Sequence, residues 1–441
     1  MYKGWFTGII WNMKFKSKIV LLLCFFVGTV CAFSEKITLS ASDAVRYALE
    51  NNITVKENKI NLDSAAREKN FSWNGISPSA SLSANYSRDV PSKENSHDTI
   101  SAGVRISASL TPSLYTQIKN AALAYQAQEI TFENAKNTIS SSVLKSYYAI
   151  LYEVENLELS RKNLETKKKQ YDANLEKFNR GMLNQVDVLS AQIAWQNMEL
   201  TVETQKINLE NSLAQFRQSL GLSQETEIEF SNNFERFFSF NKIDEDKITV
   251  KSSEIELLEK QLESAKNTLL ANRFKTYGPS ISASYNYSEN YAADGFEKLS
   301  DGGSVSAGVS IPLDGIMPWS SSAQGIDSAK ENIRLLELKL EDQKTTVRIK
   351  ADSLIKKINQ CVENIKVRKS SIELAETNYA MTLKAYNYGT RDLLTLQAAQ
   401  DNLLESKVNL ISEANTLVAC LCDLINISDI GFENITGEVN E

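Results

Sequence analysis

Few residues in this sequence could carry out catalysis or bind a metal ion. The chain has one histidine, His97, so a catalytic triad or a metal site built on histidine would depend on that residue alone. The sequence holds no glycine-rich phosphate-binding loop, and its carboxylates are spread along segments of helical periodicity, as on a solvated face. We therefore predict that the protein is not an enzyme and needs no cofactor.

Cysteine is the other residue type that could do chemistry here. Cys361, Cys420 and Cys422 follow the N-terminal region. Cys420 and Cys422 could contact a metal ion, but no nearby histidine or third cysteine completes a site. An odd set of three thiols on helical segments is no disulfide framework either. We expect all three to pack in a core, and we predict no metal site.

Composition and charge restrict the partners. The formal net charge of −7 argues against a nucleic-acid partner, because binding phosphates requires a basic face. Only 6 prolines and 17 glycines in 441 residues predict long, uninterrupted elements.

The N-terminus is typical of an export signal. MKFKSK from Met13 is basic, IVLLLCFFVGTV follows as an apolar run, and Val30-Cys31-Ala32 fits a cleavage site with small residues. We predict a signal peptide over residues 1–32, with Met13 as a possible true start. A membrane anchor is the alternative, although the run is short for one. Lipidation of Cys31 is a second alternative.

The chain is a tandem duplication. PSASLSANYS from Pro78 and PSISASYNYS from Pro279 share seven of ten positions, and each precedes a second alternating stretch that begins SAGV. KFNRGMLNQVDVLSAQ from Lys177 matches AYNYGTRDLLTLQAAQ from Ala385. The order in both halves is helix, strand, strand, long helix, glycine turn, helix.

The alternating stretches predict β-strands with one apolar and one polar face. A soluble, half-buried sheet is one interpretation. Export and a length near ten residues favour the other, which is strands of an outer-membrane barrel that turn their apolar side toward lipid. The apolar positions expected on the strands are Ala80, Leu82, Ala84, Tyr86, Ala102, Val104, Ile106, Ala108, Leu110, Ile281, Ala283, Tyr285, Tyr287, Val305, Ala307, Val309, Ile311 and Leu313.

The segments between the strands and the glycine turns predict very long helices. Residues 114–178 and 320–388 carry apolar residues at coiled-coil spacing, and about 65 residues at 1.5 Å rise correspond to about 100 Å. Gly181 and Gly389 then allow a reversal into an amphipathic return helix.

These elements predict the domain organisation and the assembly. Four strands cannot close a barrel, and open sheet edges are not tolerated in lipid, so the chain must combine its strands with those of other copies. The expected segments are a signal peptide (1–32), a first repeat (33–220, with a β-hairpin at 79–110 and a helical hairpin at 114–220), an equatorial segment (221–252), a second repeat (253–427, with a β-hairpin at 280–313 and a helical hairpin at 320–427) and a tail (428–441).

With this order, and with the paired tips FNRGMLNQVDVLSAQ and YNYGTRDLLTLQAAQ, the chain resembles the TolC family of outer-membrane efflux proteins over essentially its whole mature length. The second tip is close to the family's Y-x-x-G-T-R pattern. The resemblance implies a mainly α fold with a membrane β-barrel portion: a homotrimer with a 12-stranded barrel in outer-membrane lipid, continued by a 12-helix periplasmic tunnel. It also implies docking to a periplasmic adaptor protein and an inner-membrane transporter, for export of drugs or other small molecules. Protein secretion through the same kind of duct is the alternative.

The resemblance also implies site residues. The family's latch at the closed tunnel end falls on Asp187, Tyr386 and Arg391, and its two constriction aspartates fall on Thr395 and Ala398. That ring is therefore missing or moved, for instance to Asp392, which could equally be a helix N-cap. The latch residues could be ordinary exposed helix ends. The tips that would contact the adaptor comprise Gly181, Met182, Leu183, Gly389 and Thr390.

Two other classes of protein remain as alternatives. One is a purely structural periplasmic coiled coil, and the other is the adaptor itself. An adaptor has one helical hairpin inserted in β-rich domains, whereas this chain has two hairpins with strands at their opposite ends. The sequence names neither the transported substrate nor the partner pump.

Overall fold

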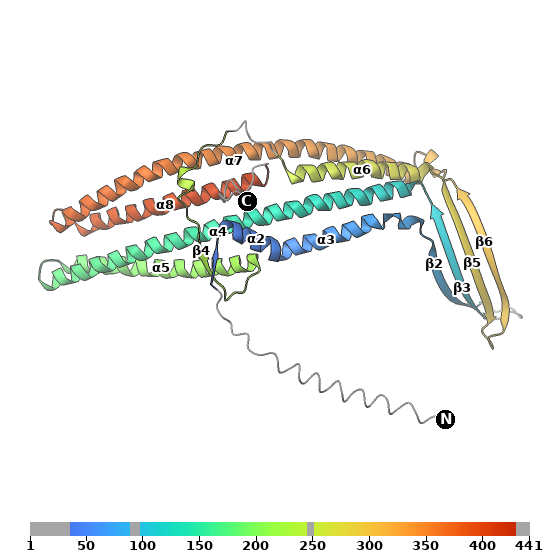
Figure 1. Cartoon of the computed structure of the whole chain (residues 1–441), viewed down its shortest axis with the longest axis horizontal. Coiled ribbons are helices and arrows are strands. Elements are labelled where there is room, and N and C mark those ends of the chain that lie inside the picture. The colour runs from blue at the N-terminus through green and yellow to red at the C-terminus, as the bar shows by residue number, and fades with distance from the viewer. Residues whose placement is uncertain (1–35, 89–97, 245–250, 429–441) are drawn as a thin grey trace, which may run out of the picture.

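The structure, a computed structural model, describes residues 36–88, 98–244 and 251–428. The expected signal peptide with Cys31, the single histidine His97, and the tail from residue 429 onward lie outside the described residues. The chain is elongated, with a β-sheet at one end, helical hairpins at the other and short elements between them (Figure 1). We call this middle region the equator.

Two helices run from the sheet past the equator to the far end. They are α4 (Ser113–Asn179) and α7 (Ser321–Asn387), each of 67 residues. At 1.5 Å per residue each is about 100 Å long. The return helices are α5 (Gln185–Leu220), which packs along α4, and α8 (Leu393–Ile425), which packs along α7. The helices expected at 114–178 and 320–388 are thus confirmed to within one residue.

The helices form a wall one layer thick. On the sheet side of the equator α3 (Ile53–Asn70) packs on α4, α4 on α6 (Ser253–Tyr277), and α6 on α7. On the other side the order is α5, α4, α8, α7. The wall is therefore four helices wide throughout. Its lateral edges are α3 and α7 on the sheet side of the equator, and α5 and α7 on the side of the hairpin tips.

Both β-hairpins belong to one antiparallel sheet of order β2-β3-β5-β6. The pairing of β3 with β5 joins the two repeats. Because all neighbours are antiparallel, the two outer strands also run in opposite directions. The strands are β2 (Ser79–Ser87), β3 (Thr99–Leu110), β5 (Ser280–Ala292) and β6 (Lys298–Ser310).

One expectation about the last strand was wrong. Ile311 and Leu313 lie beyond β6, which ends at Ser310 and leads into a short 3-10 helix (Asp314–Ile316). Pro312 explains the end of the strand, because proline has no backbone N–H to continue the ladder.

The register gives the sheet one apolar and one polar face. Leu82 lies opposite Val104, which lies opposite Tyr287, and Ile106 lies opposite Tyr285, which lies opposite Val305. On the other face Ser107 pairs with Ser284 and Ser284 with Ser306. The alternation expected on single strands therefore continues across all four strands, except at the far end of the sheet, where Glu289 and Asp301 occupy positions of the apolar face.

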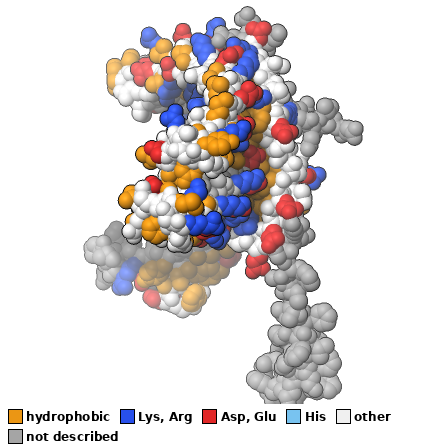
Figure 2. All heavy atoms as spheres, turned by 90° about the vertical axis from the view of Figure 1, so that its left-hand side faces the viewer, with side chains coloured by type: hydrophobic (Ala, Val, Ile, Leu, Met, Phe, Trp, Pro, Cys, Tyr) orange, Lys and Arg blue, Asp and Glu red, His pale blue; other side chains and the backbone are white. Residues whose placement is uncertain are grey.

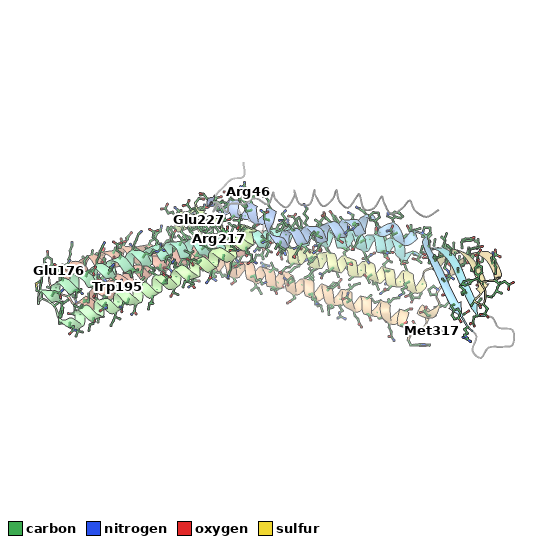
Figure 3. The ribbon with its side chains drawn as sticks, turned by 90° about the horizontal axis from the view of Figure 1, so that it is seen from below. Arg46, Glu176, Trp195, Arg217, Glu227 and Met317 are labelled. Carbon is green, nitrogen blue, oxygen red and sulfur yellow. The ribbon has the colours of Figure 1, made fainter. Side chains whose placement is uncertain are left out.

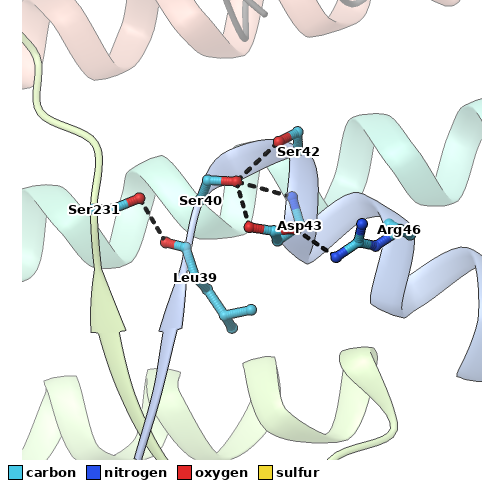
Figure 4. Close-up of polar contacts among 6 residues, drawn as sticks. All are labelled: Leu39, Ser40, Ser42, Asp43, Arg46 and Ser231. Carbon is cyan, nitrogen blue, oxygen red and sulfur yellow. Dashed lines mark hydrogen bonds and ion pairs between the residues drawn. The ribbon is translucent and has the colours of Figure 1, made fainter. Parts of the chain in front are cut away.

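At the equator the chain forms a small two-stranded sheet that the sequence pattern did not predict. Strand β1 (Lys36–Leu39) pairs in parallel with β4 (Glu227–Phe230). The Ser231 hydroxyl donates to the Leu39 carbonyl at 3.2 Å, and Ser40 caps the helix α2 (Ala41–Asn51) that follows (Figure 4). The N-terminal segment is thus attached beside the long helices.

The main hydrophobic core also lies at the equator. It joins α4, α7 and α8 with the short elements, and Phe234 and Phe237 pack against Tyr148. Cys361, Cys420 and Cys422 are all buried there, as expected, and burial raises the pKa of the Cys422 thiol to about 12. Although α8 is long and apolar enough to cross a membrane by length and composition, about half of its most apolar window is buried against its neighbours.

Candidate gate at the free ends of the helical hairpins

Both hairpins end in the same turn. Gly181 and Gly389 each have φ of +73°, a backbone conformation that side chains other than glycine disfavour. The Met182 N–H donates to the Lys177 carbonyl at 2.9 Å, and the Thr390 N–H donates to the Ala385 carbonyl at 2.9 Å. These bonds satisfy carbonyls at the ends of α4 and α7, as expected of a helix-terminating glycine motif.

The return helices also begin alike. Asn184 caps α5 by accepting from the Asp187 N–H at 2.8 Å, and Asp392 caps α8 by accepting from the Thr395 N–H at 2.8 Å. Asp392 is exposed, and hydrogen bonds from the Thr395 hydroxyl and N–H lower the pKa of its carboxyl group. Asp392 thus occupies the N-cap position, which was the simpler of its two expected roles.

Tyr386 connects the two hairpins. Its phenolic O–H donates a 2.7 Å hydrogen bond to Oδ1 of Asn174 on α4, and the Lys177 ammonium lies 5.0 Å from the centre of its ring. Asn174 is buried, and its Nδ2 has no partner within the described chain. Burial, together with the negative charge of Asp187, raises the pKa of Tyr386.

The three residues expected to form a latch are only partly brought together. Asp187 lies close enough to Tyr386 to affect its pKa, but the hydrogen bond of Tyr386 goes to Asn174. Arg391 is exposed, and within the described ranges of this single chain it has no carboxylate partner. Among the expected constriction positions Ala398 is exposed and Thr395 half-buried.

A row of polar side chains extends from this point toward the equator along α4. The row consists of Asn163, Lys167, Gln170 and Asn174, spaced so that all four lie on one helix face. Lys167 donates to the Asp401 carboxylate at 2.8 Å, and Gln170 donates to the Gln400 side chain at 2.9 Å. We call this row and its partners on α7 and α8 the polar seam.

The polar seam differs in kind from the equatorial core. Gln400 also donates to Asn163, so most of the buried polar groups along about 16 Å of α4 are hydrogen-bonded. A hydrogen bond contributes only about 0.5–1.5 kcal/mol net, because its partners bond to water when they separate. The contact between the two hairpins is therefore easier to separate here than at the apolar equator.

Each hairpin, by contrast, is firmly packed within itself. Tyr171 of α4 stacks on Trp195 of α5 with ring centroids 5.5 Å apart. Trp195 and Glu176 both lie toward the free ends, far from Met317 beside the sheet (Figure 3). Within the second hairpin, Lys407 of α8 pairs with Glu376 of α7 at 2.8 Å. Each hairpin is thus held together by contacts of its own.

Sequence reasoning missed Asn163, Lys167, Asn174 and Gln400 as site residues. A signal was present, since polar residues at three- and four-residue spacing occupy core-facing positions of a coiled-coil helix. This spacing does not identify the hydrogen-bonding partners of these residues, because partners such as Asn174 and Tyr386 are separated by 212 residues.

Comparisons with known proteins agree with this architecture. The family model for outer membrane efflux proteins matches residues 44–222. The outer membrane protein TolC of Salmonella enteritidis is 23% identical over 403 residues, which cover 86% of this chain and 78% of that protein. Both matches are to the sequence: the family model covers the first repeat, and the match to TolC extends over both.

Solved structures show the same fold. The CmeC outer membrane channel of Campylobacter jejuni aligns with a TM-score of 0.71 at 17% identity, covering 90% of this chain and 88% of that one. The open state of the MtrE outer membrane channel of Neisseria gonorrhoeae aligns with a TM-score of 0.67 at 15% identity, covering 90% and 93%. The duplicated helix–strand order, the paired glycine tips and these likenesses all support one assignment, a TolC-family outer membrane efflux protein.

Proposed function

We propose that three copies of this chain form a 12-stranded barrel in the outer membrane that continues as a 12-helix periplasmic tunnel. The protein is an outer-membrane efflux protein that extends into the periplasm. Its four-stranded sheet and four-helix wall have equal numbers of elements, so three copies supply both rings. In lipid the outer edges of β2 and β6 require partners, and the two strands run in opposite directions, as antiparallel closure requires.

The observation that carries this proposal is a pair of exposed apolar stripes. On α5 the stripe consists of Val186, Ile193, Leu200 and Ile207, and on α7 of Val367, Leu374 and Met381. Each has seven-residue spacing, which keeps its members on one side of a coiled-coil helix. Such stripes are expected to be buried against another helix.

The two stripes match each other in height. Val186 follows the tip Gly181 closely and Ile207 lies 26 residues after it, whereas Met381 precedes the tip Gly389 by 8 residues and Val367 by 22. The α5 stripe therefore covers about 30 Å next to the tips, and the α7 stripe covers about 20 Å within the same band. An end-on view shows hydrophobic side chains exposed among Lys and Arg side chains at this end (Figure 2).

The two stripes lie on different helices, and this determines the type of assembly. Helices α5 and α7 lie at opposite edges of the wall. A contact between α5 of one copy and α7 of the next is heterologous, and such contacts form a closed ring when the rotation closes. The proposed 12-stranded barrel sets the number of copies in this ring at three.

The duct is proposed to serve a tripartite pump. The tips with Met182, Leu183 and Thr390 project farthest from the sheet, and the Met182 side chain is exposed. There they would contact a periplasmic adaptor that links the duct to an inner-membrane transporter of drugs or other small molecules. The polar seam, with Tyr386 at its end, would hold the tunnel closed until the adaptor docks.

Disulfide cross-linking between stripes tests the assembly. Ile193→Cys combined with Leu374→Cys should give a covalently closed trimer after mild oxidation, because both sites lie at similar heights above the tips. Ile193→Cys with Val367→Cys is the control, since the second site lies about 15 Å from the height of the first. A monomeric product from the first pair, or an open series of larger oligomers, would contradict the ring.

Docking to an adaptor is tested separately at the tip. Met182→Glu places a charge on an exposed apolar side chain outside the stripes, so trimers should form and conduct normally. Drug efflux by cells that depend on this duct should fall. Unchanged efflux would remove Met182 from the docking surface and leave the duct itself intact.

A further inference from the structure

The polar face of the β-sheet carries a single ionisable side chain in the described strands. Its other members are Ser, Asn, Thr, Gly and one Ala, and they lie at alternate positions of β2, β3, β5 and β6. The exception is Arg105 on β3. By contrast, Lys298 of β6 forms ion pairs with Glu289 of β5 and with Asp301 of β6 at the far end of the sheet, where Glu289 and Asp301 occupy positions of the other face.

Arg105 lies near mid-height on its strand. It is six residues from Thr99, where β3 begins, and five from Leu110, where it ends, so about 17–20 Å of strand separates it from either end. Across the sheet its row consists of Ser81, Arg105, Asn286 and Ser304. No acidic residue occupies this row.

The charge of Arg105 is not neutralised by the chain itself. The side chain is exposed, and within the described residues no carboxylate pairs with it. An uncompensated guanidinium on a wall of neutral polar groups attracts anions and repels cations. Its planar array of donors also matches carboxylate, phosphate and sulfate oxygens, and the neighbouring Ser81 and Asn286 side chains add further hydrogen-bonding groups.

We propose that Arg105 forms a three-membered cationic ring inside the barrel that favours the passage of anionic solutes over cationic ones. This inference rests on the proposed trimeric barrel, in which the polar face lines the lumen. It assigns the selectivity of the membrane-spanning section to one residue of known position. The solutes it favours are those with exposed carboxylate, phosphate or sulfate groups.

The reactivity of introduced thiols measures the local potential directly, whatever the state of the tunnel end. Ser304→Cys places a thiol in the row of Arg105, and Val305→Cys places one on the adjacent residue of the opposite face. The assembled protein in outer-membrane vesicles is treated with an anionic and with a cationic methanethiosulfonate of similar size. Low ionic strength is used because the Debye length is then about 30 Å.

The expected result is a charge-dependent rate at residue 304. The ratio of anionic to cationic modification rates should fall several-fold when Arg105→Gln is added, and it should be retained with Arg105→Lys, which keeps the charge. Protein without an introduced cysteine supplies the background rate.

Two outcomes would overturn the proposal, and they are distinguishable. If Ser304→Cys reacts from water, Val305→Cys does not, and Arg105→Gln leaves the ratio unchanged, the barrel stands and the role of Arg105 falls. If residue 305 reacts with the water-soluble reagents and residue 304 does not, the polar face does not line the lumen, and the proposed barrel falls with this inference.

Discussion

The Tyr386 hydroxyl donates a 2.7 Å hydrogen bond to the side-chain oxygen of Asn174, and this bond joins the end of α7 to α4 across 212 residues of sequence. The bond lies about one helical turn from the tip at Gly389 and about two turns from the tip at Gly181, at the tip-side end of the polar seam. In the proposed tunnel, an opening movement at the tips would break this bond early.

Removing the hydroxyl should therefore favour the open tunnel. We expect Tyr386→Phe combined with Arg391→Ser to raise single-channel conductance in planar bilayers, with no decrease in the thermal stability of the trimer. Asn174→Ala should have the same sign as Tyr386→Phe and add little to it, because both changes remove one interaction. Asp187→Ala should give a smaller increase and add little to Arg391→Ser. Unchanged conductance in the Tyr386/Arg391 double variant would exclude a latch at this end.

The ion pair of the polar seam should behave asymmetrically. Lys167 is buried, with 7% of its side chain exposed, whereas Asp401 is 57% exposed. Asp401→Ala should lower the unfolding temperature, since it leaves a buried ammonium unpaired, and Lys167→Met with Asp401→Ala should recover most of the loss. Lys162→Met, which removes an exposed pair with Glu158 on the same helix, is the matched control and should have little effect. Equal effects of Asp401→Ala and Lys162→Met would contradict the importance of the seam.

The two faces of the sheet should tolerate charge differently. Val104→Arg and Val309→Arg place a charge on the apolar face, where the cost at the middle of a bilayer is about 2–4 kcal/mol. Both should reduce the yield of heat-resistant trimers from outer-membrane fractions. Ser107→Arg, on the polar face of the same strand as Val104, should be accepted. Similar yields for all three variants would argue against the membrane barrel.

Block by trivalent cations should be weak. Three like carboxylates focus the electric field at one point, but the positions of the family's constriction aspartates are held here by Thr395 and Ala398. If block is strong and disappears in Asp392→Asn, the ring has shifted to the cap residue. Strong block that persists in Asp392→Asn would show that the constriction lies elsewhere.

The cap of α8 should respond to acid. The hydrogen bonds from Thr395 lower the pKa of Asp392, so the folded state holds its proton less tightly than the unfolded chain does. The resulting stabilisation is complete above the unfolded-state pKa of about 3.9 and is lost as the pH falls through the lower folded-state pKa. Hydrogen-exchange protection of the Thr395 amide should therefore decrease at acidic pH. Asp392→Asn keeps the cap without a titrating group and should abolish that pH dependence.

The sequence by itself determined the repeated architecture. Strand alternation, the seven-residue apolar spacing and the glycine turns at Gly181 and Gly389 are local patterns, so their elements could be placed to within a few residues. Pro312 is a local signal as well. The end of β6 at Ser310 could therefore have been predicted, and extending the strand to Leu313 was an error of interpretation. The N-cap role of Asp392 was among the alternatives for the same reason.

The tertiary structure decided the contacts between distant segments. The pairing of β1 with β4, the choice of Asn174 as the partner of Tyr386, and the isolation of Arg105 on a neutral face all depend on the register between elements. Register is set by the sum of many side-chain contacts along two surfaces, and a shift of one strand residue or one helical turn changes every partner. A local sequence pattern does not report the sum of these contacts. For this reason the gate residues could be placed near the tips, but their partners could not be named.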